Sequence, residues 1–267
     1  MCSINNAKPG GPMVSALLDR FGFRHGFFTR YPGHSAGPFA AANFGTSAGD
    51  DPDVVDRNFA EAAAWLGVCR ERVVVVHQVH GVQTYLARMP VTRTESQGVH
   101  ADAVLSVSPE IACGVRSADC VPVLLADMVS GAGLAVHAGW RGVAQNIVQH
   151  AIRDASRYLA DLGQQPCQWL AAVGPHIEQC CFEVDTPIAE TLAQCAPLEQ
   201  VVVSVPGRKP HVSLRRILHY QLRQAGVAAD HIDHIAGCTK HNPEQFFSYR
   251  RDGAVSGRHL SAIVARR

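Results

Sequence analysis

Three short segments of the chain carry polar and reactive side chains beside runs of apolar residues. His77 and His80 follow four consecutive valines, Cys120 precedes an apolar run, and His137 ends another such run. Apolar runs of this length predict buried strands, and sheets usually place their sites at strand ends. Because the three segments are distant in sequence, we expect converging strands to bring these side chains into one pocket.

Two imidazoles and one thiolate form a donor set that suits zinc or copper. We predict that His80, Cys120 and His137 bind one metal ion. Three protein ligands leave a fourth position open, which is typical of catalytic zinc. His77 competes with His80 for the ligand role. On one extended strand these two residues would point to opposite faces, so at most one of them should bind.

A metal-free alternative uses two of the same residues. Cys120 could act as a nucleophile with His137 as its general base, as in cysteine hydrolases. The residue types alone leave this hypothesis open beside metal binding. A true multicopper oxidase needs several copper centres with many histidine ligands, whereas the sequence offers one His₂Cys set and no His-X-His pair.

The segment 139–142 connects the strand that ends at His137 to a helical pattern. Its two glycines let backbone N–H groups face a ligand, and a helix N-terminus favours an anion. Arg141 adds a fork of hydrogen-bond donors, so the segment predicts a phosphate or oxyanion site in which Arg141 serves catalysis. The other interpretation is a tight connection with a packed Trp140 and a solvated Arg141.

The periodicity of apolar residues predicts the elements that position these side chains. Asp51 and Pro52 mark the start of a helix, and Gly67 marks its end. The expected helices are 52–66, 143–159, 186–195 and 213–225, and the expected strands are 73–76, 82–86, 103–107, 111–115, 121–126, 134–137, 170–173, 201–203, 232–235, 246–249 and 260–264. Runs of strands with interspersed helices favour a mixed α/β sandwich over a doubly wound sheet.

Bulk properties exclude several classes of protein. A chain of 267 residues with a net charge of +1 is typical of a globular protein and does not favour nucleic acid as a partner. It has no apolar run long enough to span a membrane and no apolar stretch typical of a secretory signal. Without a secretory signal we expect the nine cysteines to be reduced thiols and the location to be cytoplasmic. No CxxC pair is present, which excludes zinc ribbons and thioredoxin-type motifs. We expect residues 1–18 to be a frayed tail and 19–267 to form one catalytic domain.

Several motifs together resemble the YfiH family, whose members are also called laccase-domain or polyphenol-oxidoreductase-like proteins. The resemblance runs from about residue 20 to the end of the chain. The motifs are FFTR (27–30), QVHG (78–81), ADC (118–120), HAGWRG (137–142), GP-I (174–177) and FFSYRRD (246–252). HAGWRG and FFSYRR are long and unusual, so the match is specific.

The resemblance implies a four-layer α/β/β/α sandwich similar to the catalytic domain of the cytotoxic necrotising factor toxins. It also implies that His80, Cys120 and His137 hold a metal ion, usually zinc and in some reports copper. Members of the family are described as purine nucleoside phosphorylases that cleave adenosine, inosine and methylthioadenosine and also deaminate adenosine. An older interpretation makes them copper-dependent polyphenol oxidases.

A phosphorylase must hold phosphate beside a nucleoside, and these two small molecules are the partners that the resemblance implies. Guanidinium groups match the oxygens of phosphate. The predicted substrate and phosphate ligands are Arg30, Arg141, Arg250, Arg251 and Ser248. The ability of zinc to activate water suits the deamination. The sequence leaves the oligomeric state open.

Overall fold

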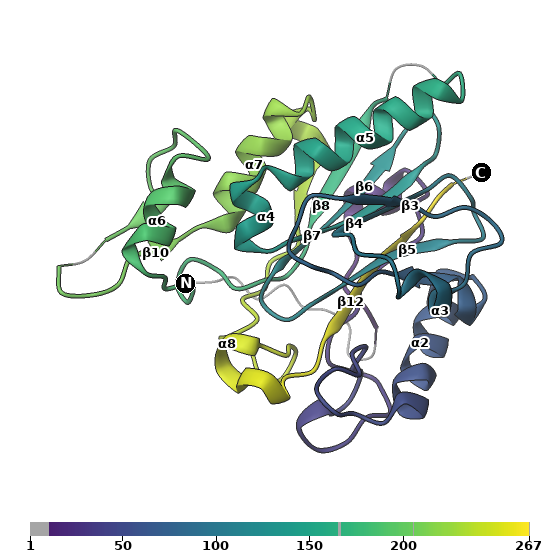
Figure 1. Cartoon of the computed structure of the whole chain (residues 1–267), viewed down its shortest axis with the longest axis horizontal. Coiled ribbons are helices and arrows are strands. Elements are labelled where there is room, and N and C mark those ends of the chain that lie inside the picture. Colours follow the sequence, from purple (N-terminus) through teal and green to yellow (C-terminus); the bar gives the residue numbers. More distant parts are fainter. Residues whose placement is uncertain (1–10, 165–166, 205, 267) are drawn as a thin grey trace.

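Two mixed β-sheets form the centre of the protein (Figure 1). The computed structural model describes residues 11–164, 167–204 and 206–266. The six-stranded sheet contains, in spatial order, β11 (Ile232–His234), β8 (Trp169–Val173), β6 (Val121–Asp127), β7 (Gly133–Ala138), β4 (Ala103–Ser106) and β3 (Thr84–Leu86). The four-stranded sheet contains β1 (His25–Phe27), β12 (His259–Val264), β5 (Ala112–Ser117) and β2 (Val73–Val75).

The structure contains eight α-helices among the described residues. They are α1 (Ala16–Arg20), α2 (Pro52–Leu66), α3 (Arg93–Ser96), α4 (Trp140–Ala144), α5 (Ile147–Asp161), α6 (Thr186–Ala193), α7 (Leu214–Gln224) and α8 (Tyr249–Asp252). The helices α5 and α7 cover the outer face of the six-stranded sheet, and α2 covers the outer face of the four-stranded sheet. Figure 1 shows α5 and α7 on one side of the strands and α2 on the opposite side. A short ribbon of β9 (Val202–Val203) and β10 (His211–Val212) adjoins α6. In the described part of the chain, no helix is both long and apolar enough to cross a bilayer.

Alternation of side chains along the strands divides the core into three clusters. On β6, Val123 packs in the cluster that contains the apolar faces of α5 and α7, whereas Leu124 faces the second sheet. On β2, Val74 belongs to the cluster between the sheets and Val75 to the cluster that contains α2. Successive residues of a strand point to opposite faces, so each strand contributes to two clusters. The expected α/β/β/α sandwich is therefore confirmed.

The predicted helix 52–66 is confirmed, but the predicted continuous helix from residue 143 is wrong. Asp51 caps α2 by accepting a hydrogen bond from the Asp53 N–H at 2.9 Å, and Gly67 ends it with a φ of 64°. Asn146 has a φ of 57°, and this left-handed residue separates α4 from α5. The helical spacing of apolar residues continues across Asn146, because both helices pack on the same core. The sequence pattern therefore does not reveal the break between α4 and α5.

Two further expectations need correction. The predicted strand 246–249 is a loop that leads into α8; the buried Phe247 donates its N–H to His259 Nε2 at 2.9 Å rather than to a neighbouring strand. The predicted frayed tail is folded from residue 11 onward. The Met13 N–H donates to the Phe27 carbonyl at 2.9 Å, and Ser15 caps α1. Residues 1–10 lie outside the described residues.

Candidate metal centre

His80 lies in a tight turn after β2. Its φ is 60°, an unusual value for a side chain other than glycine. The buried Asp102 carboxylate holds this turn, because it accepts hydrogen bonds from the N–H groups of Val79 at 3.1 Å, His80 at 3.0 Å and Gly81 at 2.7 Å. Three hydrogen bonds to one carboxylate stabilise a backbone conformation that is otherwise unfavourable.

The same carboxylate orients His137 at the end of β7. His137 Nδ1 lies 2.8 Å from Asp102 Oδ1, and donation of its hydrogen there leaves Nε2 available to a metal ion. Burial by itself lowers the pKa of His137, but the neighbouring Cys120 thiolate and Asp102 carboxylate raise it to about 9. Burial likewise opposes ionisation of Asp102, yet hydrogen bonds from His137 and the turn amides hold its pKa below the usual range.

Cys120 lies one residue before β6 and faces both histidines. Its Sγ is 3.8 Å from His80 Nε2, and the rings of His80 and His137 meet edge to face with centroids 4.9 Å apart. Burial raises the pKa of the thiol, but the charge and hydrogen bond of His137 outweigh burial and lower the pKa to about 6. Cys120 is therefore a thiolate at neutral pH, the form that binds metals and acts as a nucleophile.

The three residues fit a single metal ion. Their ligand atoms lie within 4.8 Å of one another. A tetrahedral zinc ion, with Zn–S of about 2.3 Å and Zn–N of about 2.0–2.1 Å, places sulfur and nitrogen about 3.5 Å apart. The glycine that follows leaves the necessary space, since a Cβ on Gly139 would come within 2.6 Å of His80 Cδ2 and 3.2 Å of Cys120 Sγ. The structure thus brings the predicted ligands together.

His77 lies outside this group although it lines the same cavity. Its ring packs against His100 with centroids 4.8 Å apart, and its N–H donates to the Val99 carbonyl at 2.9 Å. Only His80 of the two histidines therefore faces Cys120, as expected. The reason differs from the one predicted, because the chain turns after β2 and the two residues do not share an extended strand.

A cavity of about 720 Å³ adjoins the three candidate ligands. This volume is in the range of sites for small molecules. Aromatic and cationic side chains line it, among them Trp140, Phe182, Tyr249, Arg116, Arg141, Arg250 and Arg258. Within the described residues, none of these four arginines forms a salt bridge with a carboxylate. These four arginines outnumber Asp119, the one carboxylate in the described lining, so the cavity wall carries excess positive charge and is complementary to an anion.

Arg30, a predicted phosphate ligand, does not line the cavity. Its Nε donates to the Ala40 carbonyl, and its Nη1 donates to the Pro243 carbonyl at 3.0 Å. The guanidinium also covers the ring of Phe247 at 4.8 Å. These contacts favour a role of Arg30 in the packing of two loops over the predicted contact with phosphate.

Arg251 and Ser248 also do not line the cavity. Arg251 donates to the Phe246 carbonyl at 2.8 Å and pairs with Asp252 at 2.7 Å. Ser248 is the N-cap of α8, and its hydroxyl accepts a hydrogen bond from the Arg251 N–H at 3.2 Å. These contacts favour a role of both residues in stabilising the loop around α8 over the predicted contact with substrate.

Arg141 and Arg250 do line the cavity, in agreement with the sequence. Arg141 is exposed and lies over the ring of Trp140 at 4.8 Å. The helix behind it, α4, has 5 residues, so it cannot supply the dipole expected of a long helix. Arg250 donates from Nη1 to the Glu183 carbonyl at 2.7 Å.

Arg116 and Arg258 are cavity residues that the prediction of phosphate ligands missed. Burial lowers the pKa of both guanidiniums, and the charge of Arg258 lowers the pKa of Arg116 further. Gln78 fixes the Arg116 backbone, because its Oε1 accepts from the Arg116 N–H at 2.8 Å and its Nε2 donates to the Arg116 carbonyl at 2.7 Å. Arg116 lies close to the ADC motif and Arg258 close to the FFSYRRD motif. This proximity was the signal in the sequence that could have identified both arginines as cavity residues.

Asp119 lines the cavity and connects the ADC and FFSYRRD motifs. Its φ of 93° is unusual for a non-glycine residue. Asp119 Oδ1 accepts a hydrogen bond from the Thr239 hydroxyl at 2.6 Å, and Oδ2 accepts one from the Arg250 N–H at 2.6 Å. These bonds fix the residue that precedes Cys120.

Comparison with known proteins identifies the family. Residues 24–266 match the family model described as multi-copper polyphenol oxidoreductase laccase. The chain belongs to this family. A laccase-family relative from Streptomyces coelicolor, named a purine nucleoside phosphorylase, is 37% identical over 232 residues that cover 86% of this chain and 91% of the relative. A relative of the same name from Deinococcus radiodurans is 34% identical and covers 96% of this chain and 93% of its own length.

Solved structures share the laccase-family fold. YlmD from Geobacillus stearothermophilus is 28% identical, with a TM-score of 0.85 and coverage of 100% of both chains. YfiH from Bacillus licheniformis has a TM-score of 0.86 at 24% identity and covers 98% of each chain, which shows a common fold. The resemblance to YfiH is confirmed, while the likeness to the necrotising factor toxins stays a prediction.

Proposed function

We propose that this laccase-family protein is a zinc-dependent purine nucleoside phosphorylase acting on adenosine, inosine and methylthioadenosine. The observation that carries the proposal is one cavity that joins the His₂Cys group to four arginines without carboxylate partners among the described residues. Relatives named purine nucleoside phosphorylases support it. These substrates and the free thiols fit the cytoplasmic location expected from the sequence.

The phosphate site is built from arginines on separate segments. Arg116 and Arg258 are half-buried and form its inner side, whereas Arg141 and Arg250 are exposed. Partly buried cations without a salt bridge to a carboxylate are costly, and a bound phosphate offsets that cost. Guanidinium groups bind phosphate oxygens in pairs, so the arginines also orient the anion.

The aromatic side chains supply a surface for the purine. Trp140, Phe182 and Tyr249 line the cavity. Flat aromatic rings pack favourably against one another, and so these side chains suit a purine better than an aliphatic group. With both substrates held, a phosphate oxygen forms a bond to ribose C1′ while the N-glycosidic bond breaks. The electron pair of that bond passes to the purine, which takes up a proton as it departs.

His80, Cys120 and His137 would hold the metal ion at the inner end of this cavity. When bound, zinc supplies Lewis-acid chemistry, which is also what deamination of adenosine requires. We include adenosine deaminase activity in the proposal on this ground. Copper-dependent polyphenol oxidation is a weaker alternative, because it requires several copper centres with many histidine ligands. The described residues contain two groups of three or more potential metal ligands, and one of these groups consists of three cysteines and one histidine.

A cysteine hydrolase is the second candidate, and one observation favours it. Cys120, His137 and Asp102 stand in the order of nucleophile, base and orienting carboxylate, with His137 Nδ1 2.8 Å from Asp102. The pKa of Cys120 is lowered to about 6, which keeps the nucleophile charged. In this alternative no metal occupies the site, and a covalent adduct forms at Cys120.

The decisive experiment measures release of hypoxanthine from inosine by zinc-loaded protein, with and without phosphate. Phosphorolysis predicts a rate that saturates with phosphate and yields ribose 1-phosphate in equal amount. Arg153 is an exposed arginine of α5 and serves as the control for the cavity arginines. Its replacement should leave the saturation of the rate with phosphate unchanged. Equal rates without phosphate would overturn the proposal, and a covalent substrate adduct at Cys120 would support the hydrolase.

A further inference from the structure

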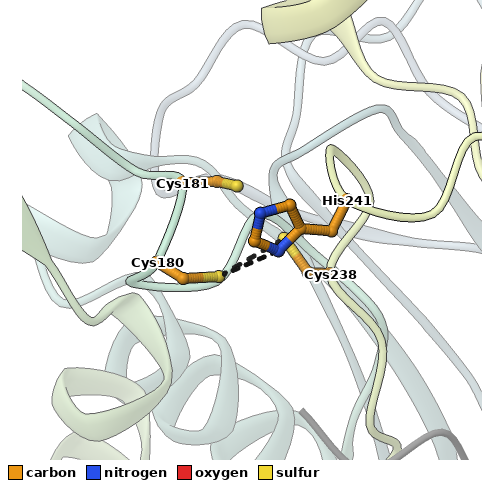
Figure 2. Close-up of side chains that lie close together, drawn as sticks. All are labelled: Cys180, Cys181, Cys238 and His241. Carbon is orange, nitrogen blue, oxygen red and sulfur yellow. Dashed lines mark hydrogen bonds between the residues drawn. The ribbon is translucent and has the colours of Figure 1, made fainter. Parts of the chain in front are cut away.

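A second group of metal-ligating side chains lies apart from the candidate centre. Cys180, Cys181, Cys238 and His241 each offer one ligand atom, and these four atoms lie within 4.8 Å of one another. Figure 2 shows the three sulfurs gathered around the imidazole of His241. None of the four residues lines the cavity. The chemistry proposed for the cavity therefore gives no reason for this cluster.

The separations match those of a tetrahedral site. With Zn–S of about 2.3 Å and Zn–N of about 2.0–2.1 Å, tetrahedral ligands lie about 3.8 Å apart for two sulfurs and about 3.5 Å apart for sulfur and nitrogen. Cys180 Sγ lies 3.9 Å from Cys238 Sγ and 3.5 Å from His241 Nδ1 (Figure 2). A disulfide needs an S–S distance of about 2.05 Å, so the two cysteines are not bonded here.

We propose that Cys180, Cys181, Cys238 and His241 bind one zinc ion as a structural site. Three thiolates and one imidazole are a complete tetrahedral set for zinc, without the open position of a catalytic site. Cys181 and Cys238 are buried, whereas Cys180 and His241 are exposed, so an ion can enter from solvent and be closed off by the buried pair.

The ion would join a loop that lines the cavity to a loop that supports a residue of the cavity wall. One loop follows β8 and carries Phe182, which lines the cavity. The other follows β11 and carries Thr239, whose hydroxyl donates to Asp119 at 2.6 Å. The loops already meet where His176 pairs with Cys238. A shared metal ion would fix this contact and thereby hold Asp119 and the adjacent Cys120 in place.

The test is the zinc content of a variant that retains only the second site and of a variant that retains neither site. We expect the double variant C120A/H137A to keep one tightly bound zinc per chain, measured by mass spectrometry of the metal after desalting. Adding C238A/H241A should remove that zinc. Absence of zinc from C120A/H137A, or its retention after C238A/H241A is added, would overturn the proposal. This readout does not depend on the activity of the cavity.

Because Cys238 is buried, its replacement could unfold the loops, so two exposed ligands provide an independent test. C180S and H241A are each expected to weaken zinc binding in the C120A/H137A background while the circular dichroism spectrum is retained. After substitution with cobalt(II), C180S should lower the thiolate-to-cobalt absorption in proportion to the thiolate removed. C69S, at an exposed cysteine elsewhere, is the matched control and should change nothing. Unchanged cobalt absorption in C180S would contradict the proposed ligand set.

Discussion

At the scale of single residues, Asp102 links the two histidines of the candidate metal centre. It holds the backbone turn of His80 and the imidazole of His137 through one carboxylate. A carboxylate behind a ligating histidine orients the ring and increases its basicity. The Asp102 side chain does not line the cavity. It is therefore a positioning residue for the metal ligands.

Replacing Asp102 with Asn should lower zinc affinity by about 10- to 100-fold, the usual effect of altering such a partner. The amide cannot accept all of the hydrogen bonds that the carboxylate accepts. Competition with a chromogenic chelator measures the affinity. Asp127→Asn is the matched control: Asp127 is equally buried and accepts from Ser130 and Gln168 at the opposite end of β6. A similar loss in both variants would mean that the effect is general destabilisation.

Replacing Arg258 with Ala should raise the phosphate KM by about 10- to 100-fold, because a hydrogen bond to a charged group contributes about 1.5–3 kcal/mol. Arg141→Ala should raise it less, since Arg141 is exposed. Arg30→Ala is the matched control; Arg30 does not line the cavity, so its loss should lower stability and leave the phosphate KM unchanged. Steady-state rates at varied phosphate concentration measure these KM values. A larger increase of the phosphate KM in Arg30→Ala than in Arg258→Ala would contradict the proposed position of the phosphate.

At the scale of elements, the connection from β7 to α4 brings backbone and ligands unusually close. Gly139 is the N-cap of α4 and follows β7 directly. The space beside its Cα is occupied by His80 and Cys120. The glycine in HAGWRG is therefore required by the two ligands that lie over it rather than by a special φ, which is −70°.

Gly139→Ala should weaken zinc binding, because the new Cβ would displace His80 and Cys120. Overpacking of this kind costs about 1–3 kcal/mol. Gly98→Ala is the matched control, since a Cβ there meets the Glu95 carbonyl at 3.6 Å, an ordinary contact. Zinc titration of both variants tests the prediction. Wild-type affinity in Gly139→Ala would show that the ligands have room to shift.

At the scale of the whole molecule, β12 joins the two sheets through several buried contacts. His259, at its start, accepts a hydrogen bond from the Phe247 N–H at 2.9 Å and is packed between Phe246 and Phe247. Burial lowers the pKa of His259 to about 3 from an ordinary value of 6.5. The folded protein therefore keeps this imidazole neutral at a pH where the unfolded chain protonates it.

The unfolded state binds the extra proton between pH 6.5 and about 3, so the free energy of unfolding should fall as pH drops through that range. His259→Gln retains an acceptor for the Phe247 N–H and does not titrate. We expect urea unfolding midpoints of this variant to fall less between pH 6.5 and 4.5 than those of the native protein. His150→Gln, at a half-buried position on α5, should behave like the native protein. Identical pH profiles for His259→Gln and the native protein would contradict the prediction.

Local patterns in the sequence predicted most of the strands, the helix α2 and the three candidate ligands. His80, Cys120 and His137 stand in unusual motifs at the ends of apolar runs, and their side chains suit a metal ion while leaving a cysteine nucleophile as an alternative. The order of the elements likewise predicted a mixed sandwich, because runs of strands with interspersed helices do not fit a doubly wound sheet.

Tertiary structure alone decided what the polar residues contact. Asp102 is an isolated carboxylate in the sequence, and only the pairing of β4 with β7 places it under both histidines. In the sequence, Arg30 and Arg258 both resemble anion ligands. In the structure, however, the Arg30 guanidinium donates hydrogen bonds to the backbone carbonyls of Ala40 and Pro243. The cysteines at 180 and 238 meet for the same reason. A contact between residues that are distant in the chain leaves no local pattern in the sequence. The chemistry of a side chain can therefore be predicted from the sequence, whereas its neighbours are known only from the tertiary structure.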